Sequence, residues 1–545
     1  MWKRLAENKP LISDSLVQKA ELITAILLTL IIIFLNYTFM QHGGALWRDE
    51  ANSANIATMP SFSEIWYRLQ FDPFPLFTFL LLRFWTNMGL SSDLAMRFFG
   101  FLVSISVLAA LWFNVRMLGI RTPLLSLLLF AFSPLSVRYI SSIRPHGVGI
   151  LLALLTLALT GKIMKEFRMR YVIQTVFAAV LCVHSLYRNI FFLTSFVFAA
   201  MVITALKHKW KKVFLLLLIL ILAAFSLLPY WPIIKAQDYV IIIKVPVSLP
   251  QLWEKLYSAL AATADPLFFV WTAFFLLSIG LTIYSCIFKA EQNVSQEKRD
   301  TRLFCTIVMI TSIILFFIFL KLVSVTTQPW YYLPIMAIFA ICFDAIVGTE
   351  KAGTVLRIIA AVAVVASTFS SVLDKCRTRQ TNIDIAAYML EKSAQKGDLL
   401  VADPWYLSIS FQRYYSGQAS LITVPPLEDH RTHRYDLIKA KMASTLPLQP
   451  LFTEILKTLK AGNKVWMIKE TSDLSMVPDT PAFSLAPAPK SIFKWSGNAY
   501  MGNWDSQILN FIQSLPVKIS YFQLLTDKPV SQNEDCSVVE IAGSQ

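Results

Sequence analysis

The sequence predicts a polytopic α-helical membrane protein with a soluble α/β domain at its C-terminal end. Of the 545 residues, 56% are hydrophobic and only 15% are charged, whereas average globular proteins contain about 25% charged residues. Long apolar runs recur up to about residue 374, and the hydropathy then changes to that of a water-soluble domain. We therefore expect a membrane domain over 1–374 and a soluble domain over 375–545.

Eleven apolar runs are long enough to cross the roughly 30 Å of hydrocarbon in a bilayer. They are 22–39, 93–114, 122–139, 146–162, 171–186, 189–206, 212–230, 266–288, 303–323, 331–347 and 355–373. The first run follows a polar stretch and has no cleavage-type motif of small residues behind it, so we expect a retained span rather than a signal peptide.

Basic residues cluster between these runs, as the positive-inside rule describes for cytoplasmic loops. The clusters lie before residue 20, at 116–121, at 162–170, at 207–212 and at 289–302. This pattern accounts for the net charge of +15 without a nucleic-acid partner. It predicts a cytoplasmic N-terminus, a C-terminal domain outside the cell or in the periplasm, and location in a bacterial inner (plasma) membrane. Lys375, Arg377 and Arg379 run against the trend.

The run Leu76–Leu90 is short and has Arg83 in its middle. If it crossed the membrane, every later basic cluster would face the opposite side. We therefore expect an interfacial helix on the outer surface, with Arg83 and Trp85 at the lipid headgroups. Residues 40–92 then form one long outer loop.

The C-terminal domain alternates helix and strand patterns, which is typical of a small α/β fold. Helices are expected at 382–393 and 453–461, strands at 398–401, 464–468, 517–525 and 536–541, and a proline-rich loop at 476–491. The domain contains no GxGxxG, Walker-type or GxSxG motif that would identify a ligand. Cys376 and Cys536 are candidates for a disulfide if the domain is extracytoplasmic.

The outer loop 40–92 holds the acidic residues best suited to chemistry. Asp49 and Glu50 follow Arg48 in LWRDEANSANIA. Carboxylates beside a membrane span are costly to keep there and usually have a function, and a partly desolvated carboxylate can act as a general base. The competing interpretation is an acidic pair that is salt-bridged to Arg48 or simply solvated.

Two further acidic residues follow in the same loop. Glu64 lies four residues before Arg68, which favours an exposed helical ion pair. Asp72 precedes Pro75 at a predicted helix start. It either caps that helix or faces the same cleft as Asp49, where it could be a metal ligand.

Basic and aromatic residues in the other outer segments are candidates for phosphate binding. Arg144, in SIRPHGVG, can grip a phosphate with its guanidinium, or it can be an interfacial arginine that reaches to headgroups. The remaining candidates also have structural alternatives as polar packing, solvated loop charges or an aromatic belt. They are His146, His184, Arg188, Lys235, Lys244, Gln328 and Tyr331.

Several motifs together resemble the GT-C glycosyltransferases, in particular bacterial members of the protein O-mannosyltransferase and aminoarabinose-transferase group (glycosyltransferase family 39-like). LWRDEANSANIA followed by D-x-x-P is similar to the first outer loop of that group. SIRPHGVGILLALL resembles its R-P-Y element, VHSLYRNIFFL its H-Y element and QPWYYLPIMAIFAI its R-Y-L-x-P element. The stretch IAAYMLEKSAQKGDLLVADPWYLSISFQRYY is similar to the periplasmic α/β domain that some members carry.

The resemblance implies transfer of a sugar, with inversion, from a polyprenyl-phosphate donor to a glycan, lipid or protein acceptor at the outer face of the membrane. A lipid-phosphate leaving group needs no general acid, so the reaction requires a base and positive charge for the departing phosphate. Asp49 is the implied base, and Glu50 and Asp72 support the acceptor or a divalent metal held by Asp49 and Asp72. The resemblance also implies that Arg144 helps to bind the donor phosphate. From the residues themselves, Arg188, Lys235 and Lys244 are the further candidates for the phosphate. The candidates for lining the cavity are Arg48, His146, His184, Gln328 and Tyr331.

The sequence departs from that group at three places. Phe74 and Leu76 stand where the group's His-Pro-Pro has histidine and proline, His146 replaces a tyrosine, and Gln328 or Trp330 stands where arginine is common. These departures concern the metal and the phosphate contacts, and they leave Asp49 untouched.

Two other classes of function compete with the transferase. One is a transporter or flippase of a lipid-linked sugar, although transporters tend to carry internal repeats and charges near the bilayer midplane, and the sequence shows no repeat. The other is a non-catalytic scaffold whose soluble domain binds a partner. Geometry separates these classes, because only the enzyme requires Asp49, Asp72 and Arg144 to converge on one outer site.

Overall fold

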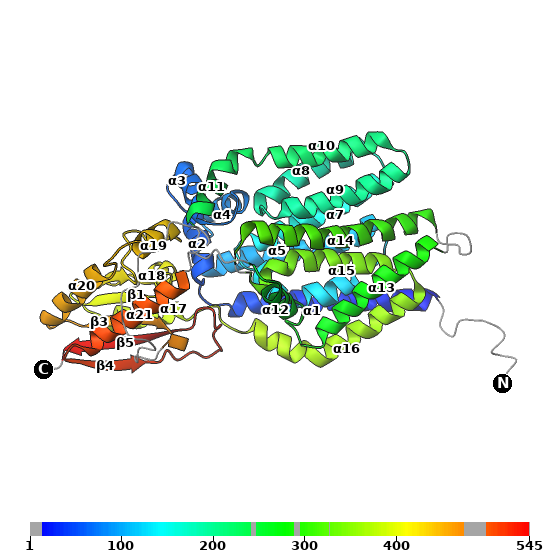
Figure 1. Ribbon diagram of the computed structural model, residues 1–545. Helices are drawn as coiled ribbons and strands as arrows, with labels where there is room; N and C mark the ends of the chain where they lie inside the picture. The colour runs from blue at the N-terminus through cyan, green and yellow to red at the C-terminus, as the bar shows by residue number, and fades with distance from the viewer. Residues whose placement is uncertain (1–13, 241–246, 288–294, 326, 474–496, 544–545) are drawn as a thin grey trace.

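A helical bundle and a smaller sheet domain lie end to end along the long axis of the molecule (Figure 1). The computed structural model describes residues 14–240, 247–287, 295–325, 327–473 and 497–543. The predicted loop 476–491 and Lys244 lie outside the described residues.

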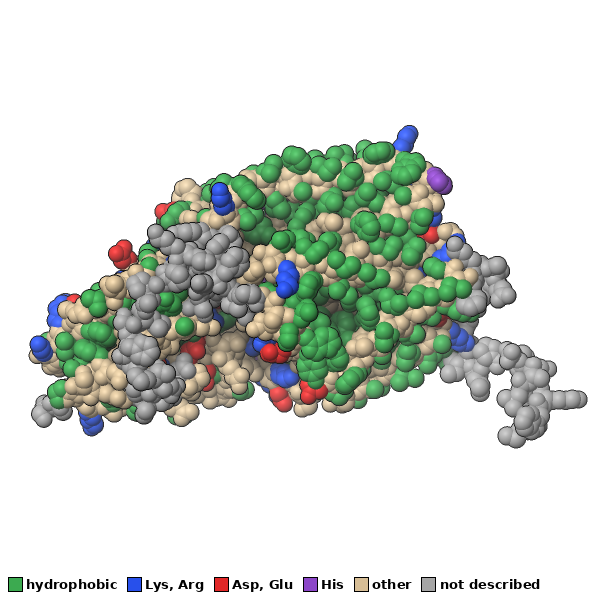
Figure 2. Space-filling model, viewed as in Figure 1, with side chains coloured by type: hydrophobic (Ala, Val, Ile, Leu, Met, Phe, Trp, Pro, Cys, Tyr) green, Lys and Arg blue, Asp and Glu red, His purple; other side chains and the backbone are tan. Residues whose placement is uncertain are grey.

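Within the described ranges, nine helical segments are long and apolar enough to cross a membrane. They are α1 (Asp14–His42), α5 (Asp93–Leu118), α7 (His146–Lys165), α9 (Asn189–Leu206), α10 (Trp210–Phe225) with its continuation α11 (Trp231–Val240), α13 (Leu267–Ile287), α14 (Gln296–Val323), α15 (Leu333–Val347) preceded by η5 (Pro329–Tyr332), and α16 (Lys351–Cys376). Figure 2 shows a bundle face covered mostly by hydrophobic side chains, as contact with lipid requires. The predicted multi-pass membrane architecture is confirmed.

Among the eleven predicted spans, one is a shorter apolar helix and one is broken. The run 171–186 is α8 (Met169–Ser185), an apolar helix of 17 residues. The run 122–139 is not one helix, because a π-helical turn, η3 (Ser126–Ala131), is followed by a bend and then by α6 (Pro134–Ile140). Pro134 has no N–H to donate and cannot continue a preceding helix, so the apolar run breaks there.

A buried ion network joins three helices to the start of this broken segment. The carboxylate of Asp344 on α15 accepts the backbone N–H groups of Leu125 (2.9 Å) and Ser126 (2.8 Å). Arg357 on α16 donates to Asp344 at 2.7 Å and also contacts Glu21 on α1. The network satisfies polar groups inside the bundle that would otherwise be costly to bury.

Within the described residues, the helix ends at 116–121, 162–170 and 207–212, which carry basic clusters in the sequence, lie at the end of the bundle away from the sheet domain (Figure 1). Their contacts tie neighbouring helix ends together: Lys165 donates to Leu118 O (2.6 Å) and pairs with Glu297 (3.0 Å), Lys207 contacts Asp300, and Arg121 contacts Gln18. This common end agrees with the positive-inside pattern, and its assignment to the cytoplasm stays a prediction.

The outer loop forms short helices between the bundle and the sheet domain: α2 (Arg48–Ala57), α3 (Phe62–Arg68), η2 (Leu69–Phe71) and α4 (Phe77–Asn87). Arg83 on α4 donates to the carbonyls of Ala57 (3.2 Å) and Met59 (2.6 Å), and Trp85 donates to Ala95 O (3.1 Å). These two side chains therefore bind protein backbone, and their position at the lipid headgroups stays a prediction.

The soluble domain is built on a five-stranded sheet of order β2-β1-β3-β5-β4. Strands β1 (Leu399–Asp403), β2 (Ser420–Thr423) and β3 (Val465–Glu470) pair in parallel, whereas β5 (Cys536–Gly543) pairs antiparallel with β3 and with β4 (Val517–Phe522). The helices are α17 (Ile383–Ser393), α18 (Leu407–Tyr414), α19 (Tyr435–Met442), α20 (Gln449–Lys460) and α21 (Gly497–Gln513), and α12 (Leu249–Leu260) completes the bundle.

The predicted α/β class is confirmed, and six of the predicted elements are present as α17, α20, β1, β3, β4 and β5. The sequence missed β2, a four-residue edge strand, and α21, which contains Gly497 and Gly502, residues that disfavour helix. It also missed α18 and α19. The proposed disulfide is absent, because Cys376 and Cys536 are both free thiols.

The sheet domain and the outer loop share one hydrophobic core. Leu46 and Ala54 from the loop region belong to the same buried cluster as Trp405 and Ile409 from the domain. Polar contacts border it: Tyr414 on α18 donates to Asp93 at 2.6 Å, and Arg413 pairs with the same carboxylate at 2.8 Å. This packing holds the domain against α2, where the candidate site lies.

Candidate functional site

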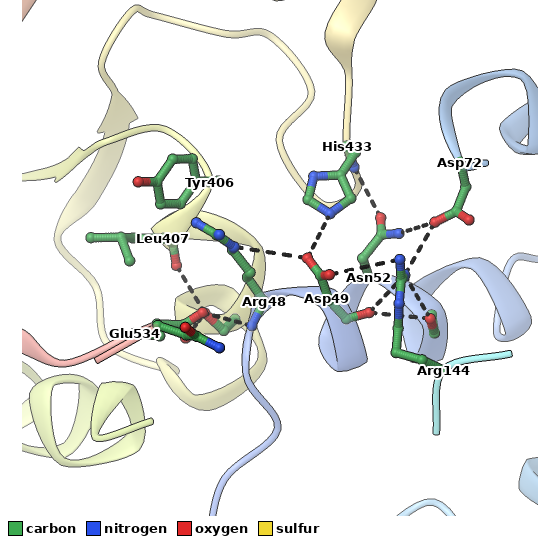
Figure 3. A network of polar contacts seen from close by, with 12 residues as sticks. Arg48, Asp49, Asn52, Asp72, Arg144, Tyr406, Leu407, His433 and Glu534 are labelled. Carbon is green, nitrogen blue, oxygen red and sulfur yellow. Dashed lines mark hydrogen bonds and ion pairs between the residues drawn. The ribbon is translucent and has the colours of Figure 1, made fainter. Parts of the chain in front are cut away.

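Helix α2 presents its first turn at the junction between the bundle and the soluble domain (Figure 3). The N-cap residue Trp47 makes no side-chain capping bond, but the carboxylate of Glu534 accepts the N–H of Arg48 at 2.7 Å. An acceptor oxygen at a helix N-terminus satisfies a donor that has no partner within the helix. The soluble domain thus caps the helix that carries Asp49.

Asp49 lies at the centre of a polar cluster, with 24% of its side chain exposed. Its oxygens are 3.4 Å from His433 Nε2, 3.7 Å from Arg144 Nη2 and 3.8 Å from Arg48 Nε. Burial by itself would raise the pKa of Asp49, but the charge of Arg144, the hydrogen bond of His433 and the charge of Arg48 together hold that pKa well below its usual range. Asp49 is therefore ionised and partly accessible.

Arg144 connects Asp49 to Asp72. Its Nη1 lies 3.2 Å from the Asp49 carbonyl, 3.2 Å from Ser53 Oγ and 3.3 Å from Asp72 Oδ2, and its guanidinium lies 4.6 Å from the centre of the Phe74 ring. The arginine is thus held inside the protein between two carboxylates, which corrects its interpretation as a headgroup-seeking side chain.

Asp72 is buried and faces this cluster. It accepts a hydrogen bond from Asn52 at 2.7 Å in addition to the one from Arg144. Burial raises the pKa of Asp72, and Arg144 opposes the increase. The helix-cap interpretation is wrong, since α4 begins at Phe77 and its N-cap is Leu76.

Glu50 does not join Asp49. It is buried on another side of α2, where it pairs with Arg97 on α5 at 2.8 Å. Arg97 also donates to Ala45 O at 2.8 Å. The structure therefore makes Glu50 an anchor between two helices and corrects its prediction as an assisting catalytic residue.

The predicted Glu64–Arg68 ion pair is replaced by a contact with the soluble domain. Arg68 pairs with Asp429 at 2.7 Å, and Glu64 is an exposed residue in the first turn of α3, which Ser61 caps.

Arg188, His146 and Tyr331 form a second polar group beside the first. Arg188 Nη2 lies 3.1 Å from His146 Nδ1, and the guanidinium is 5.3 Å from the centre of the Tyr331 ring. His146 meets Phe74, the ring beneath Arg144, edge-on at 5.3 Å. Arg188 Nε is buried without a hydrogen-bond partner among the described residues, and so it retains a donor.

The other predicted residues lie outside these two groups. His184 contacts Tyr230 OH (3.3 Å) and Ser226 Oγ (3.0 Å), which corrects its cavity-lining prediction to polar packing between helices. Lys235 is exposed on α11, and Gln328 is half-buried at the start of η5.

Sequence reasoning missed three contributors to the cluster: Asn52, His433 and Glu534. Asn52 lies inside the quoted motif but was not singled out, and the other two come from a soluble domain without recognisable motifs. His433 is more than 380 residues from Asp49 along the chain, so no local pattern could have linked them.

A divalent metal does not fit Asp49 and Asp72 as they are placed. Both carboxylates contact the guanidinium of Arg144, which lies between them. No group of three or more His, Cys, Asp or Glu side chains that could hold a metal occurs in the part of the chain that the structure describes.

Solved structures share this fold at low sequence identity. ArnT from Cupriavidus metallidurans, bound to undecaprenyl phosphate, matches with a TM-score of 0.53 and 11% identity, covering 95% of this chain and 99% of ArnT. The apo oligosaccharyltransferase of Archaeoglobus fulgidus matches with a TM-score of 0.50 and 9% identity, covering 83% of this chain and 69% of that protein. No protein-family model and no curated protein sequence matches this chain. The protein has the GT-C fold, as the resemblance of its motifs implies.

Proposed function

We propose that the protein is a membrane glycosyltransferase that moves a sugar from a polyprenyl-phosphate donor to an acceptor hydroxyl, with inversion at the anomeric carbon. The observation that carries this proposal is the convergence of Asp49, Asp72 and Arg144 in one cluster at the junction of bundle and soluble domain. ArnT, which shares the fold, was solved with undecaprenyl phosphate bound, and this supports a lipid-phosphate donor.

Asp49 is the base in this proposal. It takes the proton of the acceptor hydroxyl while the new bond forms from the acceptor oxygen to the anomeric carbon. The bond from that carbon to the phosphate oxygen breaks on the opposite face, and the polyprenyl phosphate leaves with the electron pair. Arg144 and Arg188 supply positive charge for the departing phosphate.

The low pKa of Asp49 makes it a weak base before the donor binds. Of the groups that lower this pKa, Arg144 contributes most. A donor phosphate competes with Asp49 and Asp72 for the same guanidinium, and phosphate is a strong bidentate partner of arginine. Movement of Arg144 toward the phosphate therefore raises the basicity of Asp49 when the leaving group is in place.

The proposed orientation puts this cluster on the outer face. The ends of α7 and α9, which carry Lys165 and Lys207, lie at the opposite end of the bundle, and basic loops of this kind mark the cytoplasmic side. The enzyme then works outside the plasma membrane or in the periplasm, on a glycan, lipid or protein acceptor.

Replacement of the base tests the proposal. Membranes that contain Asp49→Asn should lose transfer from polyprenyl-phosphate sugar donors by about 10²-fold or more, because the amide cannot accept the proton. Glu64→Gln, an exposed change in the same loop, is the matched control and should retain activity. Full transfer activity of Asp49→Asn would refute the mechanism. In a separate assay, passage of a labelled lipid-linked sugar across liposomes with its glycosidic bond intact would favour a flippase.

A further inference from the structure

One segment of the soluble domain reaches the base. It is the connection 424–434 between β2 and α19, and it carries His433. The His433 side chain is 8% exposed, and its Nε2 lies 3.4 Å from Asp49 Oδ1. Figure 3 shows the imidazole directed at the carboxylate from the side opposite to the helix.

The ring of His433 is held on all sides. It stacks on Tyr435 with 5.4 Å between ring centres and an interplanar angle of 1°, and it meets Trp405 edge-on at 5.9 Å. The backbone N–H of His433 donates to Asn52 Oδ1 at 2.9 Å, and Asn52 donates in turn to Asp72. These contacts restrict the position of the imidazole relative to α2.

The segment is also tied to the outer loop along its length. Asp429 pairs with Arg68 on α3 at 2.7 Å and with Arg434 at 2.9 Å. Asn55 on α2 donates to Arg431 O at 2.7 Å. These contacts place the segment as a fixed part of the cluster rather than as a loose cover.

We propose that His433 is a positioning residue for Asp49, so that the soluble domain supplies part of the active site. This inference rests on the proposed function. His433 Nε2 faces Asp49 Oδ1 at 3.4 Å and limits the rotation of the carboxylate, which leaves Oδ2 for Arg144 and for the acceptor proton. His433 Nδ1 has no hydrogen-bond partner in the described part of the chain, so Asp49 is the polar group that orients this ring.

Positioning matters here because a carboxylate turns about its bond to the methylene carbon. A base that is displaced by about 1 Å can lose on the order of 10²-fold in rate. Arg48 and Arg144 lie farther from the Asp49 carboxylate, at 3.8 and 3.7 Å, than His433 Nε2 does at 3.4 Å. Without His433, only the charges of Arg48 and Arg144 would keep the Asp49 carboxylate in position.

The test compares His433→Ala, His433→Gln and His433→Asn in the full-length protein in lipid nanodiscs. The probes are undecaprenyl-phosphate-linked hexoses and aminopentoses with membrane extract as the source of acceptor, and released undecaprenyl phosphate is measured by mass spectrometry. His430→Ala is the matched control. His430 lies on the same segment but contacts Gln412 instead of the cluster.

We expect His433→Ala to lower kcat on the order of 10²-fold while KM for the donor changes less than about threefold, since a positioning contact acts in the transition state. His433→Gln should recover most of the rate because its amide nitrogen reaches the place of imidazole Nε2, whereas His433→Asn places its amide near Nδ1 and should not. His430→Ala should match the wild type.

Two outcomes overturn the role of His433 alone: His433→Ala within twofold of an active wild type, or equal rescue by Asn and Gln, which would show that the side chain only fills space. Lack of release by the wild type from every donor would instead overturn the proposed function and the role built on it.

Discussion

At the scale of single residues, the junction buries ionisable groups and pairs each with a specific partner. Glu534 is fully buried and accepts hydrogen bonds from Arg48 N (2.7 Å) and Ser410 Oγ (2.7 Å). Burial nevertheless raises the pKa of Glu534 from 4.5 to about 7, although the two bonds and the Arg48 charge oppose the increase. This residue therefore links the stability of the domain junction to pH.

Glu534→Gln should make that link measurable. The folded protein holds the Glu534 proton more tightly than the unfolded chain, so its contribution to stability falls as pH rises from 4.5 to about 7. Glutamine carries no charge: its amide oxygen can accept the Arg48 N–H, and its amide nitrogen can donate to the Ser410 hydroxyl, which then acts as the acceptor. We expect similar thermal unfolding of variant and wild type at pH 5 and a more stable variant at pH 8, by up to about 3 kcal/mol.

The control for this experiment is Glu454→Gln, an exposed change on α20. It should leave the pH dependence of unfolding unchanged. A Glu534→Gln effect of equal size at pH 5 and pH 8 would contradict the assignment.

At the scale of elements, α2 is fixed from two directions. The soluble domain caps its N-terminus through Glu534, and the bundle holds it through the Glu50–Arg97 pair, in which both side chains are at most 2% exposed. Small residues such as Ala51 and Ser53 are buried on α2, which allows close approach of its neighbours. The first turn of α2 therefore keeps its place relative to both domains.

Arg97→Met should remove the Glu50–Arg97 ion pair that joins α2 to the bundle. The change leaves the Glu50 carboxylate buried without its charged partner, and loss of one member of a buried pair costs about 3–5 kcal/mol. We expect a large decrease in the unfolding temperature in detergent. The double variant Arg97→Met/Glu50→Gln should recover part of the loss because it removes the stranded charge, and a double variant no more stable than the single one would refute the pairing.

At the scale of the whole molecule, the basic helix ends and the candidate site around Asp49 lie at opposite ends. Lys165 pairs with Glu297 and Lys207 with Asp300 at the far end of the bundle, and the cluster around Asp49 lies at the end next to the soluble domain. Between them, the lipid-facing surface is apolar, as at Phe214 (67% exposed) and Leu276 (63% exposed). This polarity predicts that the soluble domain faces outward.

Labelling of single cysteines in intact cells tests this orientation. In a cysteine-free background, Leu525→Cys on the soluble domain, where Leu525 is 88% exposed, should react with a membrane-impermeant maleimide. Arg168→Cys, at the basic end with a 55% exposed side chain, should react only after the cells are opened. The reverse pattern would place the site in the cytoplasm.

The sequence by itself determined the features that depend on local composition. Apolar runs of about 20 residues specify membrane helices wherever they occur, and basic loops sort to one end. The acidic loop beside the first span indicated Asp49 as a candidate site residue, and the stretch SIRPHGVG indicated Arg144. Each of these signals is contained in a short stretch of sequence, so it can be recognised without knowledge of the fold.

Only the tertiary structure decided what each side chain of the loop contacts. Asp49 and Glu50 are neighbours, but successive residues of a helix point about 100° apart, and packing turned one to the site and the other to Arg97. Asp72 became a site residue because Asn52 and Arg144 meet it. His433 reached Asp49 through the docking of a whole domain, because contacts between distant segments follow from packing and leave no local pattern in the chain.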